Sequence, residues 1–232
     1  MCFSATVSFS AAAVLVSTGV YAVQQAKRLH PSYLLWAMIP ILFGLQQTCE
    51  GLVWLALDAK DASAAVPYSL GFHFFSHFLW LWWLPLCGYL IEPEKIRKQI
   101  FGGCAIFGAF AGTLVYAVMI FHPAWMSATV RQHSIFYDFS VPFHSSSYFP
   151  PAVLYALTIL VPLLFSSHRL VRIFGVLVAV SVLLASEAYG YAYVSVWCFF
   201  AAVLSLYLVY MIRRHAKDGQ GMHRTLKVVD SK

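Results

Sequence analysis

Long apolar stretches with few charges recur seven times along the chain and are separated by shorter polar segments. A helix that crosses a bilayer needs about 20 mostly apolar residues, because lipid offers no hydrogen-bond partner to an open backbone. The pattern therefore predicts an all-α integral membrane bundle of seven transmembrane helices within residues 1–212. The expected spans are residues 4–25, 33–57, 67–91, 100–121, 149–167, 170–189 and 191–212.

Composition supports the same class of fold. Of the 232 residues, 61% are apolar and only 10% are charged, whereas about 25% are charged in an ordinary soluble domain. Aromatic residues make up 17%, which excludes a disordered chain. The formal net charge of +6 comes from basic residues between the apolar stretches. We therefore expect a lipid bilayer, and no nucleic acid, as the partner.

Basic residues are distributed unevenly between alternate connections. The segments after the first, third and fifth spans, together with the tail, hold 13 of the 15 Lys and Arg residues, and Lys60 and Arg131 are on the other side. Lys and Arg concentrate on the cytoplasmic side of membrane proteins. We expect a multi-pass protein of the bacterial inner membrane, with its N-terminus outside and its C-terminus cytoplasmic. Residues 213–232 are expected to form a disordered, basic cytoplasmic tail.

One connection, over about residues 122–148, is much longer than the others and contains several His and aromatic residues. Loops of this length are usually functional or mobile, and we expect this one to cover the outer face of the bundle.

Gly108 and Gly112 form a GxxxG pattern in the fourth predicted span. Such a pattern indicates close helix packing. That packing is either within the chain or between the copies of a homo-oligomer.

Two carboxylates lie inside predicted spans, where ionisable groups are costly and are candidates for function. Glu50 is in the second span and Glu187 in the sixth, both toward the outer side. Gln46, Glu50 and Trp54 are spaced i, i+4, i+8 and share one helical face, which Gln47 flanks. This face must point into the bundle. It either fixes the packing of the helices or binds a ligand.

His73 and His77 are four residues apart in the third span, so their rings stack on one face with the spacing of helical zinc motifs. The alternative is two histidines that are hydrogen-bonded to neighbouring helices. The outer loop adds His133, and Cys2, once Met1 is removed, presents an amine and a thiol to copper or zinc. The expected ligands of a zinc or copper ion are Cys2, Glu50, His73, His77 and His133.

Several motifs, spread over nearly the whole chain, resemble those of one family. They are the opening Met1-Cys2-Phe3-Ser4-Ala5, Gln46-Gln47 with Glu50-Gly51 and Trp54, His133-Ser134-Ile135 with Tyr137-Asp138, and the run from Tyr193 to Phe200. The chain resembles a family of small, uncharacterised bacterial polytopic membrane proteins with no assigned activity. The resemblance implies that Cys2, Glu50, His133, Tyr137, Asp138 and Trp197 are worth testing. The expected ligand-binding residues are Gln46, Gln47, Trp54, Tyr137, Asp138, Glu187 and Trp197.

Two other seven-helix classes fit less well. Microbial rhodopsins need a Lys in the last helix for the retinal Schiff base, and residues 191–212 contain none, so no retinal is expected. Lipid hydrolases related to alkaline ceramidases hold zinc with three His, an Asp and a Ser. The His73/His77 pair beside Ser76 is similar, but its place in the chain does not match.

The ligand-capable residues gather in the outer half of the predicted bundle. The first hypothesis is a binding or sensing protein with a periplasm-facing polar site for a metal ion or small ligand. A metal-dependent membrane hydrolase, which acts on a lipid or amide with Glu50 or Asp138 as general base, is the second. The third is a small-solute transporter, whose helices could be kinked at Pro40, Pro85 and Pro162.

Overall fold

The computed structural model describes residues 4–28, 31–131, 133–139, 149–189 and 193–229. A π-helical segment, Phe74–Leu79, joins α3 to α4 without a break, so that Ala62–Ile91 forms one long helix. Each of the seven predicted spans corresponds to helix. The helices are α1 Ala5–Ala26, α2 Leu34–Asp58, α3 Ala62–His73, α4 Trp80–Ile91, α5 Lys95–Phe121, α6 Phe149–Leu164, α7 Arg169–Tyr189 and α8 Tyr193–Val229.

Five helices among the described residues are long and apolar enough to cross a membrane, which indicates a membrane protein. These are Ala5–Ala26, Ala62–Ile91, Lys95–Phe121, Arg169–Glu187 and Ser195–Arg214. Helix α2 is not among them, because its polar residues lower its mean hydropathy. The apolar part of α6, Val153–Leu164, is shorter than a full span.

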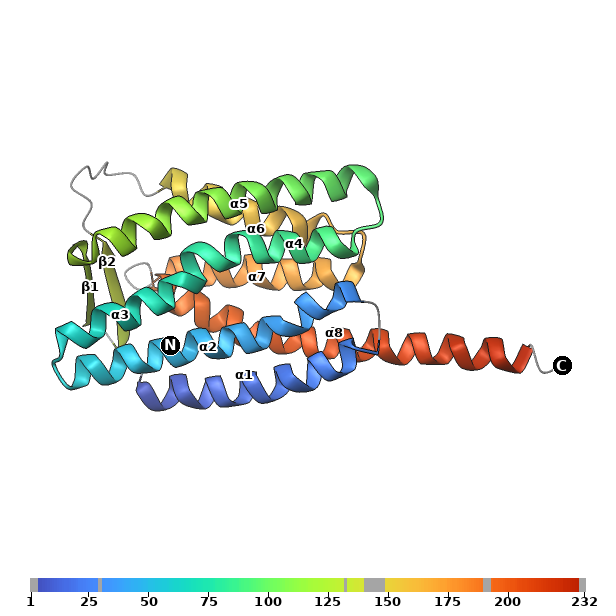
Figure 1. The fold of residues 1–232 in the computed structure, drawn as a ribbon, viewed down its shortest axis with the longest axis horizontal. Helices are drawn as coiled ribbons and strands as arrows, with labels where there is room; N and C mark the ends of the chain where they lie inside the picture. The colour runs from blue at the N-terminus through green and yellow to red at the C-terminus, as the bar shows by residue number, and fades with distance from the viewer. Residues whose placement is uncertain (1–3, 29–30, 132, 140–148, 190–192, 230–232) are drawn as a thin grey trace.

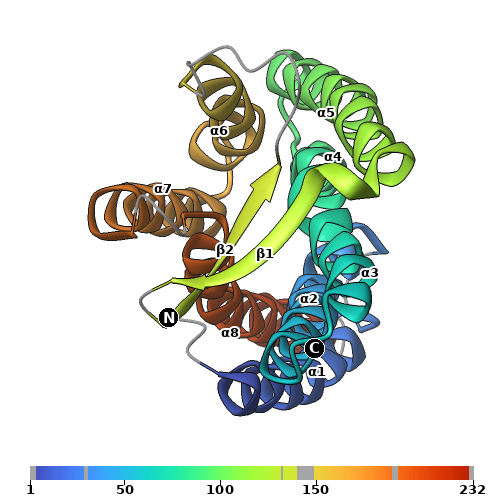
Figure 2. The ribbon, with the colours of Figure 1, turned by 90° about the vertical axis from the view of Figure 1, so that its left-hand side faces the viewer.

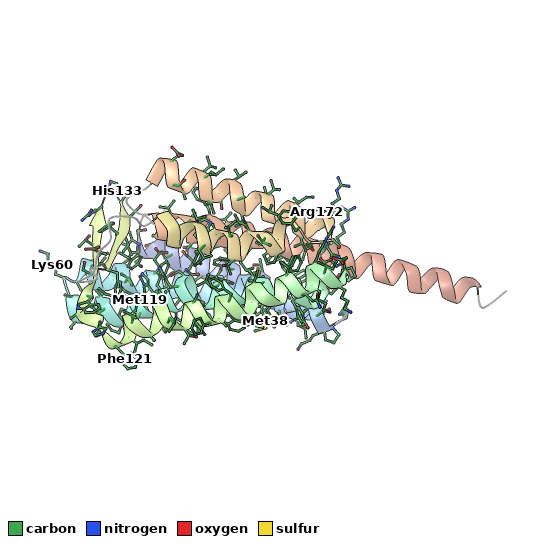
Figure 3. The ribbon with its side chains drawn as sticks, turned by 90° about the horizontal axis from the view of Figure 1, so that it is seen from above. Met38, Lys60, Met119, Phe121, His133 and Arg172 are labelled. Atoms are coloured by element: carbon green, nitrogen blue, oxygen red, sulfur yellow. The ribbon has the colours of Figure 1, made fainter. Side chains whose placement is uncertain are left out.

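The helices lie side by side along the long axis of the molecule, and a β-hairpin lies across one end of the bundle (Figures 1 and 2). We call this end the hairpin end, and the opposite end, which α8 leaves toward the C-terminus, the basic end. Lys60 and His133 lie at the hairpin end and Arg172 at the basic end (Figure 3). The helix connections rich in Lys and Arg are all at the basic end.

Helix α5 packs closely on the α3–α4 helix through its two glycines. A Cβ atom on Gly108 would overlap the carbonyl of Leu81, and one on Gly112 would come within 3.1 Å of the carbonyl oxygen of His77. The GxxxG pattern therefore mediates packing within the chain, as one of the two interpretations predicts, and a homo-oligomer stays a prediction. Helices α1 and α2 also approach closely, at Gly19 and Gly44.

The long outer connection contains an antiparallel hairpin that the sequence pattern did not predict. Strand β1, Met126–Arg131, pairs with β2, Ser134–Phe139, so that Arg131 lies opposite Ser134. His133 is at the turn with φ 63°, a left-handed conformation. The hairpin packs on the bundle through Ile135, which is buried against Val53 and Trp54 of α2. The expected cap is therefore a small sheet, and residues 140–148 lie outside the described part of the chain.

At the other end, α8 continues to Val229 and projects from the bundle (Figure 1). In the structure the last apolar span and the polar segment after it form one uninterrupted helix up to Val229. That residues 213–232 form a disordered cytoplasmic tail stays a prediction.

A buried carboxylate joins two connections at the basic end. Glu92, 2% exposed, follows α4 and accepts hydrogen bonds from the backbone N–H of Ser167, at 2.8 Å, and from the hydroxyls of Ser167 and Ser166. Burial alone would raise the pKa of Glu92, but the hydrogen bonds, chiefly those from Ser167, outweigh it and hold this pKa below its ordinary value. His168 adds a hydrogen bond from Nε2 to the Ile91 carbonyl at 2.8 Å.

Candidate functional site

Glu50 is the centre of a buried polar group that joins α2 to α8. Its side chain has no exposed surface. The Ser195 hydroxyl donates to Oε1 at 2.5 Å, and Nε2 of Gln47 donates to Oε2 at 3.2 Å. Because Ser195 lies at the start of α8, this hydrogen bond ties two helices that are far apart in the sequence. The stripe predicted on α2 does point into the bundle.

Gln46 extends this group toward α4. Its Oε1 accepts a hydrogen bond from Nε1 of Trp80 at 2.8 Å, and the Trp80 ring stacks on Phe43 with the ring centroids 4.1 Å apart. Gln46 Nε2 is buried and has no hydrogen-bond partner within the described residues, although the thiol of Cys198 lies beside it. A donor is therefore available a short distance from the Glu50 carboxyl. We call the set Gln46, Gln47, Glu50, Trp80, Ser195 and Cys198 the Glu50 group.

Sequence reasoning missed the contribution of α8 to this group. Ser195, Cys198, Ala202 and Ser205 follow one face of α8 and are all buried. Small residues on one face are typical of close helix packing, and packing accounts for Ala202 and Ser205. Ser195 and Cys198 instead face α2 at the level of Glu50. The spacing of Ser195 and Cys198, i and i+3 on the face that enters the bundle, was the available signal.

His73 and His77 form a second polar group, at the start of the π-helical segment. Their rings stack with centroids 4.8 Å apart, as the i, i+4 spacing predicts. The Nδ1 of His73 hydrogen-bonds the carbonyl oxygen of Ser69 at 2.7 Å, and Nδ1 of His77 lies 2.9 Å from the hydroxyl of Ser76. Each imidazole thus has a partner on its own helix. π-Helical turns occur often at functional sites.

The hairpin and two further helices surround this histidine pair. The ring of Tyr137, on β2, meets His73 edge-on at 4.8 Å and stacks on Phe72 at 4.9 Å. On the other side, the Tyr155 hydroxyl of α6 donates to the carbonyl of Ser76 at 2.6 Å. Tyr155 also contacts the ring of Trp197 on α8 at 5.5 Å. Of the residues expected in a site, Tyr137 therefore contacts the histidine pair directly, and Trp197 is linked to it through Tyr155.

The remaining candidate residues are spread over the hairpin end. His133 is exposed at the hairpin turn, and Glu187 is exposed on α7. Asp138 is half-buried on β2 opposite Ser127, and Trp54 packs under the hairpin. The structure brings Gln46, Gln47 and Glu50 together, and Trp54 lies one helical turn from Glu50 on the same face of α2, whereas His133 and Glu187 lie on the surface.

The expected metal ligands do not form one set within the described residues. No three His, Cys, Asp or Glu side chains there come together as metal ligands would. Glu50 has its partners in the Glu50 group, and the two imidazoles have theirs near Ser69 and Ser76. Cys2 lies outside the described residues.

Comparison with known proteins identifies a family. Among curated proteins and among solved structures, nothing matches this chain. The profile of one protein family matches residues 1–222, nearly the whole length. The expectation of an uncharacterised family is thereby met: the chain belongs to the family of unknown function DUF6629.

Proposed function

We propose that this chain is a binding or sensing protein of the bacterial inner membrane, and that the Glu50 group binds a small ligand that enters from the hairpin end. One observation carries the proposal. A carboxyl group without exposed surface lies inside an apolar bundle, where Ser195 and Gln47 donate hydrogen bonds to it.

The energetic cost of burying a carboxylate favours a ligand-binding role for Glu50 over a role in packing alone. Transfer of an ionised carboxylate from water into a protein interior costs several kcal/mol even after relaxation, and such groups inside membrane segments usually mark functional sites. An apolar side chain would fill the space of Glu50 without that cost. Packing alone therefore explains Glu50 less well than a ligand that interacts with its carboxyl.

The chemistry of the group suits a small cationic ligand with N–H donors. Glu50 offers carboxyl oxygens as acceptors, and Gln46 Nε2, a buried donor, lies beside the thiol of Cys198. Trp80 fixes the Gln46 amide through its hydrogen bond to Oε1, so the direction of this donor is set before a ligand arrives. An ion of the ammonium class has the N–H donors that the Glu50 carboxyl would accept.

The hairpin supplies a cover on the side from which the ligand would enter. Its buried Ile135 lies on Val53 and Trp54, one turn of α2 beyond Glu50. Tyr137 of the same strand reaches the histidine pair. Displacement of the hairpin would therefore open the bundle next to both polar groups.

Helix α8 offers a route from the site to the opposite end. Ser195 binds Glu50 near the start of α8, and the same helix leaves the bundle at the basic end and continues to Val229. A ligand that takes the place of the Ser195 hydroxyl would release α8 from α2. Such a link between the site and the opposite end of the molecule favours a sensing role.

Charge distribution supports a periplasmic hairpin end. The helix connections at the basic end hold Lys27, Arg28, Lys95, Arg97 and Lys98, and α7 and α8 add further arginines. By the positive-inside rule this end is cytoplasmic. The N-terminus would then be outside and the C-terminus inside.

The metal form of the hypothesis, with zinc or copper, depends on Cys2 joining described ligands such as His73 and His77. No specific observation favours the membrane hydrolase or the transporter, and both stay sequence-based hypotheses.

Titration of the purified full-length protein in lipid nanodiscs tests the proposal. Methylammonium, Zn²⁺ and Cu²⁺ are the probes, and binding is measured by calorimetry. We expect Glu50→Gln to weaken methylammonium binding at least tenfold, whereas Glu187→Gln, an exposed carboxylate on α7, should bind as the unaltered protein does. Absence of methylammonium binding, or equal binding by both variants, would contradict a ligand site at Glu50. Tight Zn²⁺ or Cu²⁺ binding that Glu50→Gln abolishes would support the metal form instead.

A further inference from the structure

A groove runs between α6 and α7 at the basic end of the bundle, far from the Glu50 group. Its volume is about 430 Å³, and it is lined by Leu164, Arg169, Arg172, Ile173, Val176 and Leu177. Arg169, Arg172, Ile173 and Val176 follow the i, i+3, i+4, i+7 spacing and share one face of α7. The groove is therefore cationic at its mouth and apolar along its length.

Arg172 is held in place at the mouth of the groove. Its Nη1 donates to the carbonyl oxygens of Ser166 at 2.8 Å and Ser167 at 3.2 Å. Within the described part of the chain, its Nε and Nη2 donors have no protein partner. The guanidinium is thus positioned by one nitrogen and keeps donors for an anion.

Within the described residues, no carboxylate forms an ion pair with Arg169 or Arg172. The ion pair found there joins Arg97 to Glu94. Arg169 is exposed and lies one turn before Arg172 on the same face. Two uncompensated guanidinium groups one helical turn apart can share a phosphate, to which arginine donates charge-assisted hydrogen bonds.

The apolar part of the groove lies on the surface of a helix that is apolar enough to cross a membrane. Val176 is 52% exposed and Ile173 is 38% exposed, so an acyl chain can lie directly on them. A free phosphate would use the arginines but leave this apolar wall bare.

We propose that this groove binds one anionic phospholipid, with its phosphate at Arg169 and Arg172 and an acyl chain along Ile173 and Val176. Basic pockets between transmembrane helices on the cytoplasmic side bind anionic headgroups in this way. The proposal is independent of the function of the Glu50 group and rests on the groove and its two arginines.

Native mass spectrometry of the full-length protein, released from micelles with phosphatidylglycerol or phosphatidylcholine, tests the headgroup. We expect one retained phosphatidylglycerol, held several-fold more strongly than phosphatidylcholine. Each basic residue near an anionic surface contributes roughly a fivefold change in affinity, so Arg169→Gln should weaken retention about fivefold. Arg213→Gln, an exposed arginine at the same end but outside the groove, should change it little. Equal retention of the two lipids, or equal loss in both variants, would overturn the proposal.

A second pair of variants tests the acyl-chain part without altering a charge. Val176→Trp fills the groove and should reduce phosphatidylglycerol retention several-fold. Val180→Trp, one turn further along α7, exposed to 47% and outside the lining of the groove, is its control. Full retention in Val176→Trp, or displacement of the lipid by millimolar inorganic phosphate as effectively as by excess phosphatidylglycerol, would show that the groove binds phosphate and no acyl chain.

Discussion

Glu50 shows how one polar side chain can organise a contact between helices. One carboxyl oxygen accepts from Gln47, on the preceding turn of the same helix, and the other from Ser195, 145 residues later in the chain. In a low-dielectric interior such hydrogen bonds are strong, and the loss of either partner exposes the full cost of desolvation. The Glu50 group therefore contributes to the packing of α2 on α8, whatever it adds as the proposed site.

The variant Ser195→Ala should destabilise the fold by about 1–3 kcal/mol, because it leaves a buried carboxyl oxygen without its hydroxyl donor. Ser205→Ala is a matched control: Ser205 is equally buried on α8 but donates to the Ala202 carbonyl of its own helix at 2.6 Å. Thermal unfolding in detergent measures both. Equal losses of stability would mean that the Ser195–Glu50 hydrogen bond stabilises the fold no more than the hydrogen bond of Ser205 within its own helix.

Glu92 makes the connections at the basic end sensitive to acid. Its pKa is held low in the folded protein, chiefly by the hydrogen bonds from Ser167, which outweigh the effect of burial. Because the folded pKa is the lower one, this stabilisation is complete above the ordinary glutamate pKa of about 4.3 and is lost as the pH falls through the depressed value. The melting temperature of Glu92→Gln should therefore fall less steeply with decreasing pH than that of the unaltered protein. Parallel curves would contradict this assignment.

Helical spacing alone predicted that Gln46, Glu50 and Trp54 share a face and that His73 stacks on His77. It could not predict the pairing of Glu50 with Ser195, because that contact depends on how α2 and α8 pack. It also suggested one site where the structure has two polar groups, since spacing along each helix carries no information on the distance between helices.

At the scale of the elements, the α3–α4 helix and α5 form the closest contact involving a predicted motif. The glycines at positions 108 and 112 let the α5 backbone approach the carbonyls of Leu81 and His77. The contact falls at the π-helical segment, so α5 supports the backbone beside the histidine pair. In membranes there is no hydrophobic driving force between helices, and small residues stabilise such contacts because they allow close van der Waals packing.

We expect Gly108→Ala to destabilise the protein by about 1–3 kcal/mol, because an added methyl group meets the Leu81 backbone, which cannot move aside easily. Gly103→Ala, on the same helix, places its methyl group in open space and should be neutral or slightly stabilising. Unfolding of both variants in the same detergent provides the comparison. A neutral Gly108→Ala would show that α5 can move away from α4 at little cost.

The helices could be predicted from the sequence because long apolar stretches recur along it and are separated by shorter polar segments. The hairpin could not be predicted in this way. Its strands, Met126–Arg131 and Ser134–Phe139, are short and partly polar, and the sequence between them lacks the Asn-Gly or Asp-Gly pair that marks tight hairpins. Burial of Ile135 on α2, a tertiary contact, fixes it instead.

For the whole molecule, the account requires the hairpin end and the basic end to lie on opposite sides of a membrane. Lys60 is exposed at the hairpin end (Figure 3), and Lys95 is exposed as the first residue of α5, which begins at the basic end (Figure 1). In intact bacterial cells carrying the chain with Cys2→Ser, a membrane-impermeant maleimide should label Lys60→Cys and should label Lys95→Cys only after lysis. The reverse pattern would place the hairpin end in the cytoplasm.

The most direct test of the Glu50 site is infrared difference spectroscopy of the nanodisc-embedded protein with and without methylammonium. The account predicts a change in a carboxyl stretching band that is present in the unaltered protein and in Glu187→Gln but absent in Glu50→Gln. Methylammonium binding with no carboxyl band change, or a change that persists in Glu50→Gln, would contradict it.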